Sequence, residues 1–279
     1  MTAGFKKLIV SRPFMQDQLI NRIKKLTGKK YVTLVHRCNR AIFLALRIAQ
    51  QAGKDTVLMP DMGGWLTFRQ YSKKLGMKIV ELKTECGLFD PAIVEKNASP
   101  HCVLIVHSLA AYAVPLDMIG IERVCAKKGC LLINDCSGSI GTPNCTVGDL
   151  IVCSFGKEKP VNAGYGGFIA TNNQQLHAQI REEVFDDNET TNVWNHLRLL
   201  ETRLTMLRKI HNRVKKDLQR FDIVHRHFPG LNVIVRFSTY DERNEILSYC
   251  QLNNLPWTEC PRNIRILEPA ISIEVKRLG

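Results

Sequence analysis

Between residues 31 and 171, short apolar runs alternate with segments of helical periodicity. The apolar runs predict strands at 31–35, 56–59, 78–82, 103–106, 130–134, 150–153 and 167–171. Between them, apolar positions recur every three or four residues, which predicts helices at 40–52, 67–75 and 116–128. This alternation is typical of a mostly parallel sheet covered by helices on both faces. We therefore expect an α/β fold with three layers, α/β/α.

A different pattern follows in the last third of the chain. Leucines recur at steps of three and four over 193–221, which predicts one long helix with basic residues on its other faces. Beyond it, we expect strands at 232–237, 264–267 and 271–275 and a helix at 241–253. The sequence thus predicts a large domain over residues 1–190 and, over 191–279, a linking helix with a reduced α+β domain.

Charge is the compositional feature that adds most to this picture. The 279 residues carry a formal net charge of +13, which attracts polyanions such as RNA. Arg208, Lys209, Lys215 and Lys216 lie on the basic side of the long helical pattern. Two interpretations stay open: these residues form an ordinary solvated face, or they bind RNA or another polyanion.

The remaining composition excludes several classes of protein. No apolar run approaches the roughly 20 residues that cross a bilayer, and the N-terminal residues lack the pattern of a signal peptide. We therefore expect a cytoplasmic protein without a membrane segment. The ten cysteines include no Cys-x-x-Cys pair, so we expect no metal site.

Polar residues that can take part in catalysis follow two of the expected strands. Asp135 comes directly after the run 130–134, and Ser154 follows 150–153, with Lys159 and the pair Gly166-Gly167 further on. Ligands of such sheets bind at the carboxyl ends of the strands. A lysine can carry the aldehyde of pyridoxal phosphate as a Schiff base, and a carboxylate can keep its pyridine nitrogen protonated. The alternative is a solvated loop lysine and an aspartate that only caps a helix or turn.

Several motifs in this order resemble the DegT-type (DegT/DnrJ) sugar aminotransferases, a family of fold-type I pyridoxal-phosphate enzymes. The resemblance spans residues 25–220 and includes the segments 54–60, 75–82 and 133–141 together with Ser-Phe-x-x-x-Lys and Gly-Gly. It implies an aminotransferase that uses pyridoxal 5'-phosphate with an amino donor and a carbonyl acceptor. It also implies a homodimer.

The resemblance assigns roles to individual residues. The family's Schiff-base lysine lies five residues after the serine and seven before the first glycine, and both counts select Lys159 over Lys157. The resemblance implies that Ser154 binds the cofactor phosphate. It makes Asp135 the partner of the pyridine nitrogen.

The sequence departs from the family pattern near the cofactor. Cys38 and Asn39 replace the Gly-Thr that opens the phosphate-binding helix, and we expect them to contact the phosphate. Gly138 stands where the family often has Gln or His, and the segment 108–112 is longer than usual. Trp65 is the expected aromatic cover of the cofactor ring.

These departures leave other functions open. A degenerate protein of the same fold could have lost catalysis and serve as a basic, RNA- or polyanion-binding partner. A pyridoxal-phosphate lyase or desulfurase would use the same lysine and aspartate, so the sequence does not separate these reaction types.

Overall fold

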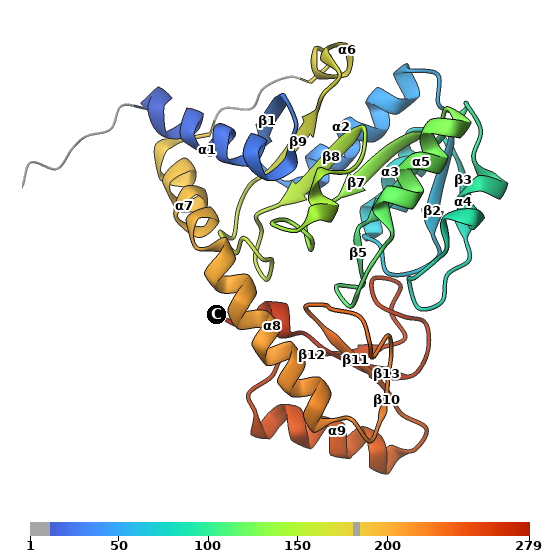
Figure 1. Ribbon diagram of the computed structural model, residues 1–279, viewed down its shortest axis with the longest axis vertical. Helices are drawn as coiled ribbons and strands as arrows, with labels where there is room; N and C mark the ends of the chain where they lie inside the picture. The colour runs from blue at the N-terminus through green and yellow to red at the C-terminus, as the bar shows by residue number, and fades with distance from the viewer. Residues whose placement is uncertain (1–11, 181–184) are drawn as a thin grey trace, which may run out of the picture.

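The computed structural model describes residues 12–180 and 185–279, and within them a seven-stranded sheet forms the centre of the larger lobe (Figure 1). Its strands, in spatial order, are β1 (Tyr31–Val35), β9 (Gly167–Thr171), β8 (Leu150–Ser154), β7 (Leu131–Asp135), β4 (Cys102–His107), β2 (Thr56–Pro60) and β3 (Lys78–Leu82). All neighbouring pairs are parallel except those made by β9, which runs antiparallel to β1 and β8. The expected α/β fold class is confirmed.

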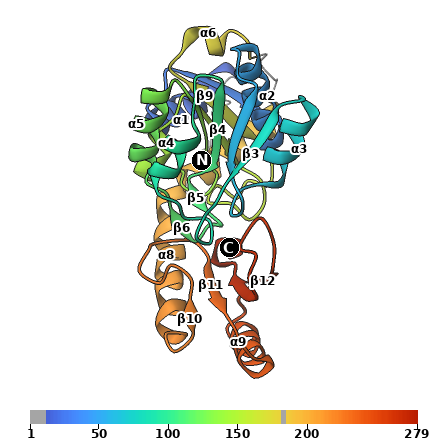
Figure 2. The ribbon, with the colours of Figure 1, turned by 90° about the vertical axis from the view of Figure 1, so that its right-hand side faces the viewer.

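Helices cover both faces of this sheet (Figure 2). One face packs against the apolar sides of α2 (Cys38–Gln51) and α3 (Leu66–Lys74). The other face packs against α1 (Arg12–Thr27), α4 (Pro91–Asn97), α5 (Met118–Lys128) and α7 (Asp187–Arg198). Adjacent strand residues point to opposite faces, so Val57 packs on the α2 side while Leu58 packs on the α5 side. Short pieces complete the lobe: α6 (Gln174–His177), the 3₁₀ turn Pro143–Thr146 and the hairpin β5 (Leu109–Ala110) and β6 (Val114–Pro115).

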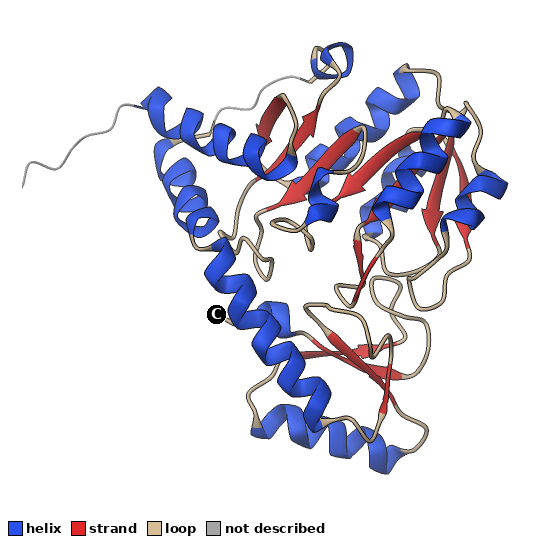
Figure 3. Ribbon diagram, in the orientation of Figure 1, coloured by secondary structure: helices blue, strands red, loops and turns tan. Residues whose placement is uncertain are grey.

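The smaller lobe is an antiparallel sheet with a helix beside it (Figure 3). The long helix α8 (Leu200–Asp217) leads into it, and its strands lie in the order β10 (Asp222–Ile223), β11 (Val233–Arg236), β13 (Ala270–Ile273) and β12 (Trp257–Cys260). Helix α9 (Tyr240–Leu252) and the 3₁₀ turn Val275–Arg277 complete this lobe. One continuous apolar cluster extends from Phe168 in the large sheet through Leu204 of α8 to Ile271 in the small sheet.

Two elements predicted from the sequence are wrong. The single helix over 193–221 is two helices, because Leu199 leaves helical geometry (φ −89°, ψ 1°) and joins α7 to α8. Leu197 and Leu200 are both buried, so the apolar spacing continues across the break and hides it. The strand at 264–267 is a turn, in which the amide of Arg262 donates to the carbonyl of Ile266. Ile266 is fully buried while Leu267 is exposed.

Residues 12–180 and 185–279 contain neither a membrane-spanning helix nor a cluster of metal-binding side chains. No helix in these ranges has both the length and the apolar character that crossing a membrane requires. The same ranges hold no group of three or more His, Cys, Asp or Glu side chains arranged to bind a metal ion.

Candidate active site

A cavity of about 290 Å³ lies at the carboxyl ends of the parallel strands. The structure brings all the site residues expected from the sequence to its wall, namely Cys38, Asn39, Trp65, Asp135, Ser154 and Lys159. They come from the start of α2, the loop after β2, the ends of β7 and β8, and the loop between β8 and β9. The strand ends meet here because β7 and β8 are parallel neighbours.

Asp135 is the last residue of β7 and is buried. Its Oδ1 accepts hydrogen bonds from the amide of Ser137 at 3.0 Å and from the Ser137 hydroxyl at 2.5 Å. The Ser137 hydroxyl oxygen also accepts from the amide of Ser154 at 2.9 Å. Ser137 therefore couples the ends of the two strands and holds the carboxylate in a fixed orientation at the cavity wall.

Lys159 lies in the loop between β8 and β9, partly buried, and its amine is oriented by aromatic groups. Its Nζ donates to the Tyr112 hydroxyl at 2.8 Å and lies 5.0 Å from the centre of the Trp65 ring. Burial lowers the pKa of Lys159, but Tyr112 and then Asp135 raise it, and the net direction is upward. Lys157 also lines the cavity, but it is exposed.

The start of α2 supplies backbone donors to the same cavity. The residue before the helix, Arg37, makes no side-chain hydrogen bond that caps it within the described chain, and the amides at such a helix start are typical donors to an anion. The Asn39 side chain has another task, because its Oδ1 accepts from Trp65 Nε1 at 3.0 Å and thereby orients the indole. Burial, and then Asp135, raise the pKa of the Cys38 thiol well above its usual range. Cys38 is therefore a neutral packing residue.

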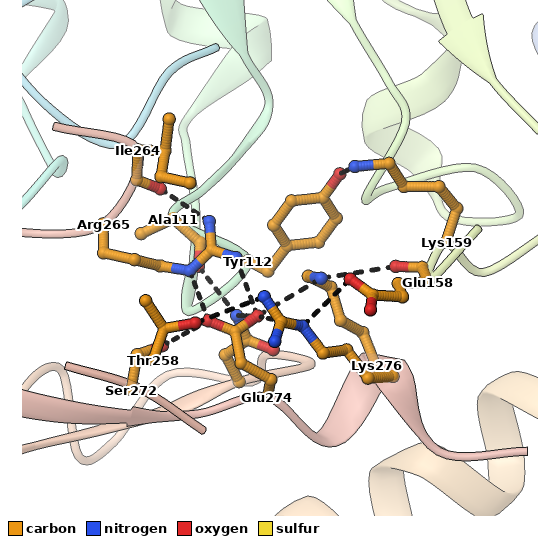
Figure 4. Close-up of polar contacts among 12 residues, drawn as sticks. Ala111, Tyr112, Glu158, Lys159, Thr258, Ile264, Arg265, Ser272, Glu274 and Lys276 are labelled. Atoms are coloured by element: carbon orange, nitrogen blue, oxygen red, sulfur yellow. Dashed lines mark hydrogen bonds and ion pairs between the residues drawn. The ribbon is translucent and has the colours of Figure 1, made fainter. Parts of the chain in front are cut away.

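The opposite wall comes from the C-terminal lobe, and none of the site residues predicted from the sequence lies on it (Figure 4). Arg265 and Lys276 line the cavity, and Glu274 lies behind them. Arg265 Nε and its terminal nitrogen donate to the two Glu274 oxygens at 2.6 and 2.7 Å. Lys276 Nζ lies 3.2 Å from Glu274 Oε2. All three are almost fully buried. The signal in the sequence is that three charged residues, Glu274, Lys276 and Arg277, interrupt the apolar run over 270–278.

Mutual pairing explains how these charges remain buried. Burial raises the pKa of Glu274, but Arg265 and the neighbouring lysine outweigh it and bring the value to about 2. For Lys276 burial dominates, and its pKa falls to about 8 despite the nearby Glu274. The cluster is a compact ionic group between the two lobes.

The residues present fit pyridoxal phosphate. The cavity combines a fixed carboxylate, an amine, two flanking aromatic rings and an uncapped helix start beside the Ser154 hydroxyl. These are the donors and acceptors that a pyridine nitrogen, an aldehyde, a planar ring and a phosphate require.

Comparison with known proteins agrees with this fit. A sequence model of the DegT/DnrJ/EryC1/StrS aminotransferase family matches residues 14–223. Among solved structures, the fold is similar to a putative sugar aminotransferase from Streptococcus pneumoniae in its PMP form, with 13% identity over 95% of this chain and 88% of that one and a TM-score of 0.77.

Two further structures share the fold. One is PseC from Helicobacter pylori, an aminotransferase involved in pseudoaminic acid biosynthesis, with 13% identity, coverage of 93% and 85%, and a TM-score of 0.72. The other is 3-amino-5-hydroxybenzoic acid synthase, with 16% identity, coverage of 94% and 87%, and a TM-score of 0.67. From the family match and the cavity together, the chain belongs to the DegT/DnrJ/EryC1/StrS family of pyridoxal-phosphate-dependent aminotransferases.

Proposed function

We propose that this protein moves an amino group from a small-molecule donor to a carbonyl acceptor, with Lys159 and Asp135 as its catalytic residues. One observation carries the proposal: an amine and a fixed carboxylate, delivered by neighbouring strands, face the same cavity. Pyridoxal phosphate, when bound, supplies the electron sink for the reaction.

The two catalytic residues have complementary tasks. Lys159 would hold the cofactor aldehyde, and its amine, when free, would move the proton at the substrate carbon that bears the amino group. Asp135 holds a proton on the pyridine nitrogen, because an opposite charge beside it favours the protonated form. The hydrogen bonds from Ser137 keep that carboxylate oriented throughout.

Three other groups hold the cofactor in place. The Ser154 hydroxyl and the first amides of α2, at Cys38 and Asn39, receive the phosphate. Trp65 covers the ring, in the orientation that the Asn39 side chain imposes. Asn39 therefore contributes its backbone to the phosphate and its side chain to Trp65.

The test is the visible spectrum of the purified protein. We expect an absorbance band from the bound cofactor, and borohydride reduction followed by mass spectrometry should locate the cofactor on Lys159. Lys159→Ala should abolish the band while the circular dichroism stays unchanged. Lys157→Ala, the matched control two residues away, should retain it. Loss of the band in Lys157→Ala alone would refute this assignment.

The reaction type and the partners are further parts of the proposal. A half-reaction screen over amino acids, following loss of the visible band, separates aminotransfer from lyase or desulfurase chemistry, which releases a product without an acceptor. We also propose a cytoplasmic homodimer. A monomer in sedimentation at micromolar concentration that still binds cofactor would contradict the dimer.

We also propose the division of the chain at residue 190. Around this position α7 begins and leads along the large lobe toward α8 and the small sheet (Figure 1).

A second candidate function is binding of RNA or another polyanion. The observation that favours it is the exposed row of Arg208, Lys209, Arg213 and Lys216 on α8. Lys215 does not belong to this row, because its amine donates to the carbonyls of His225, Arg226 and Phe228.

A further inference from the structure

Tyr112 is the side chain that contacts the amine of Lys159. It lies in the turn between β5 and β6, almost fully buried, and its hydroxyl faces the lysine at 2.8 Å (Figure 4). The centre of its ring lies 4.9 Å from the amine of Lys159, 4.9 Å from that of Lys276 and 5.6 Å from the guanidinium of Arg265. Tyr112 is thus placed between the lysine on one side and the ionic group of the C-terminal lobe on the other.

The backbone at this turn is strained, and the C-terminal lobe holds it. Ala111 and Tyr112 have φ values of 53° and 60°, a left-handed conformation that costs free energy in residues other than glycine. The amides of Leu231 and Asn232 donate to the Tyr112 carbonyl at 2.7 and 2.9 Å. Asn232 Nδ2 donates to the Ala111 carbonyl at 3.2 Å and to Glu274 at 3.1 Å. The conformation that directs Tyr112 to the lysine therefore depends on residues more than 100 positions later.

Gly138 makes room for the ring of Tyr112. A Cβ at this position would lie 2.9 Å from two ring carbons of Tyr112 and 3.0 Å from His107 Cε1. A side chain at 138 and the observed position of Tyr112 therefore exclude one another. Gly138 therefore leaves the space in which Tyr112 from the turn reaches the Lys159 amine.

We propose that Tyr112 is a catalytic residue that holds the Lys159 amine in position through its hydroxyl, and that the C-terminal lobe acts on the lysine through it. The proposal depends on the function above only in treating Lys159 as the reacting amine. A hydrogen bond to the charged form of an amine stabilises that form. Asp135, Cys38 and Tyr112 are the titratable groups that face this amine, with His107 and Lys276 close enough to act on it by charge.

The first test measures Lys159 directly, in the full chain after hydroxylamine has released the cofactor as its oxime and dialysis has removed it. Competitive acetylation with acetic anhydride over a pH series, read by mass spectrometry, reports the titration of this one lysine. In Tyr112→Phe the titration should move to lower pH, because the group that raised the pKa is lost. Tyr249→Phe, which removes a tyrosine hydroxyl bonded to Asp217 on the small lobe, should leave it unchanged. An identical titration in wild type and Tyr112→Phe would overturn the proposal.

The second test uses the exclusion between position 138 and the ring. Gly138→Ala should shift the Lys159 titration in the same direction as Tyr112→Phe, because the added methyl group displaces the ring. In a Tyr112→Ala background the same substitution should add nothing, since coupled changes are not additive. An equal effect of Gly138→Ala in both backgrounds would refute the steric link.

The third measurement is turnover. It separates failure of the proposed aminotransferase function from failure of the role proposed for Tyr112. In the cofactor-loaded enzyme, Tyr112→Phe should lower kcat about tenfold, the size expected for one hydrogen bond to a charged group, with little change in KM. If wild type converts no donor at all, the proposed function fails, and the acetylation result still decides the role of Tyr112. A shifted titration with unchanged kcat would limit Tyr112 to the resting protein and refute the catalytic part.

Discussion

Both walls of the cavity carry charged side chains, but the two walls use them differently. On the wall made by the strand ends, Lys159 and Asp135 lie in hydrogen-bonding distance of neutral hydroxyl groups. On the C-terminal wall, Arg265, Glu274 and Lys276 pair with one another. Charges that are paired internally form structure, whereas charges held only by neutral groups can still act on a ligand. Burial at a cavity therefore does not by itself identify a reactive residue.

The largest effect on activity is expected from a substitution on the strand-end wall, at Asp135. Asp135→Asn keeps an oxygen that can accept from Ser137 but removes the charge, so kcat/KM should fall at least about a hundredfold while the protein stays folded. Amino-donor half-reactions in a stopped-flow instrument measure this. Asp90→Asn, which preserves the cap of α4, serves as the control and should react normally. Full activity in Asp135→Asn would show that the reaction does not need the charge on the strand-end wall, and would contradict the distinction between the two walls.

The C-terminal wall should respond in stability. Glu274→Gln leaves the buried cations Arg265 and Lys276 without their anion, which should cost about 3–5 kcal/mol of unfolding free energy. Urea unfolding measures the change. Glu259→Gln breaks an exposed pair with Arg243 and should change stability little. Equal losses of unfolding free energy in both variants would show that the buried cluster contributes no more to stability than the exposed ion pair.

A smaller effect on stability is expected from acid pH. It involves two buried histidines, His107 at the end of β4 and His211 in α8. Burial lowers the pKa of both His107 and His211 to about 4. In the unfolded chain each titrates near its ordinary 6.5, so between pH 6.5 and about 4 the unfolded state binds protons that the folded state excludes. Stability should therefore fall as the pH drops through this window, by up to about 3 kcal/mol for each histidine.

His211→Leu isolates one of these contributions. Its Nε2 is buried without a hydrogen-bond partner in the described chain, so leucine should fill the site and make the decline of unfolding free energy between pH 6.5 and 5 less steep. Chemical denaturation at several pH values provides the measurement. An unchanged slope would exclude His211 as a source of the acid sensitivity.

The smallest effect is expected at the exposed basic row of α8. Replacing Arg208, Lys209 and Lys216 together by alanine should weaken retention on single-stranded RNA at low salt, because each neutralised phosphate releases counterions. The cofactor spectrum should not change, since these side chains do not line the cavity. If wild type retains no RNA at about 50 mM salt, the row is an ordinary solvated face.

The sequence was informative for the strand-end wall because buried parallel strands are short apolar runs, and the residue that ends each run is visible. Asp135 and Ser154 could be placed at one edge of the sheet for this reason. Tyr112 and the C-terminal wall could not be predicted. Their positions depend on contacts between the turn after β4 and residues such as Asn232 and Glu274, and no local pattern encodes them. The break at Leu199 was hidden for a related reason, since buried leucines continue on both sides of it.

The apolar cluster that joins Phe168, Leu204 and Ile271 also determines how the protein unfolds. Because the two lobes share one core, neither can lose its packing without exposing apolar surface of the other. The lobes are thus architectural units but a single cooperative folding unit. A fragment that ends at residue 190 would lack the α8 leucines that belong to the same apolar cluster as Ile151 and Phe168. It would also lack the C-terminal contacts that hold the turn at Tyr112. Such a fragment would be prone to aggregation during synthesis, and assembly of the active site must await completion of the C-terminal lobe.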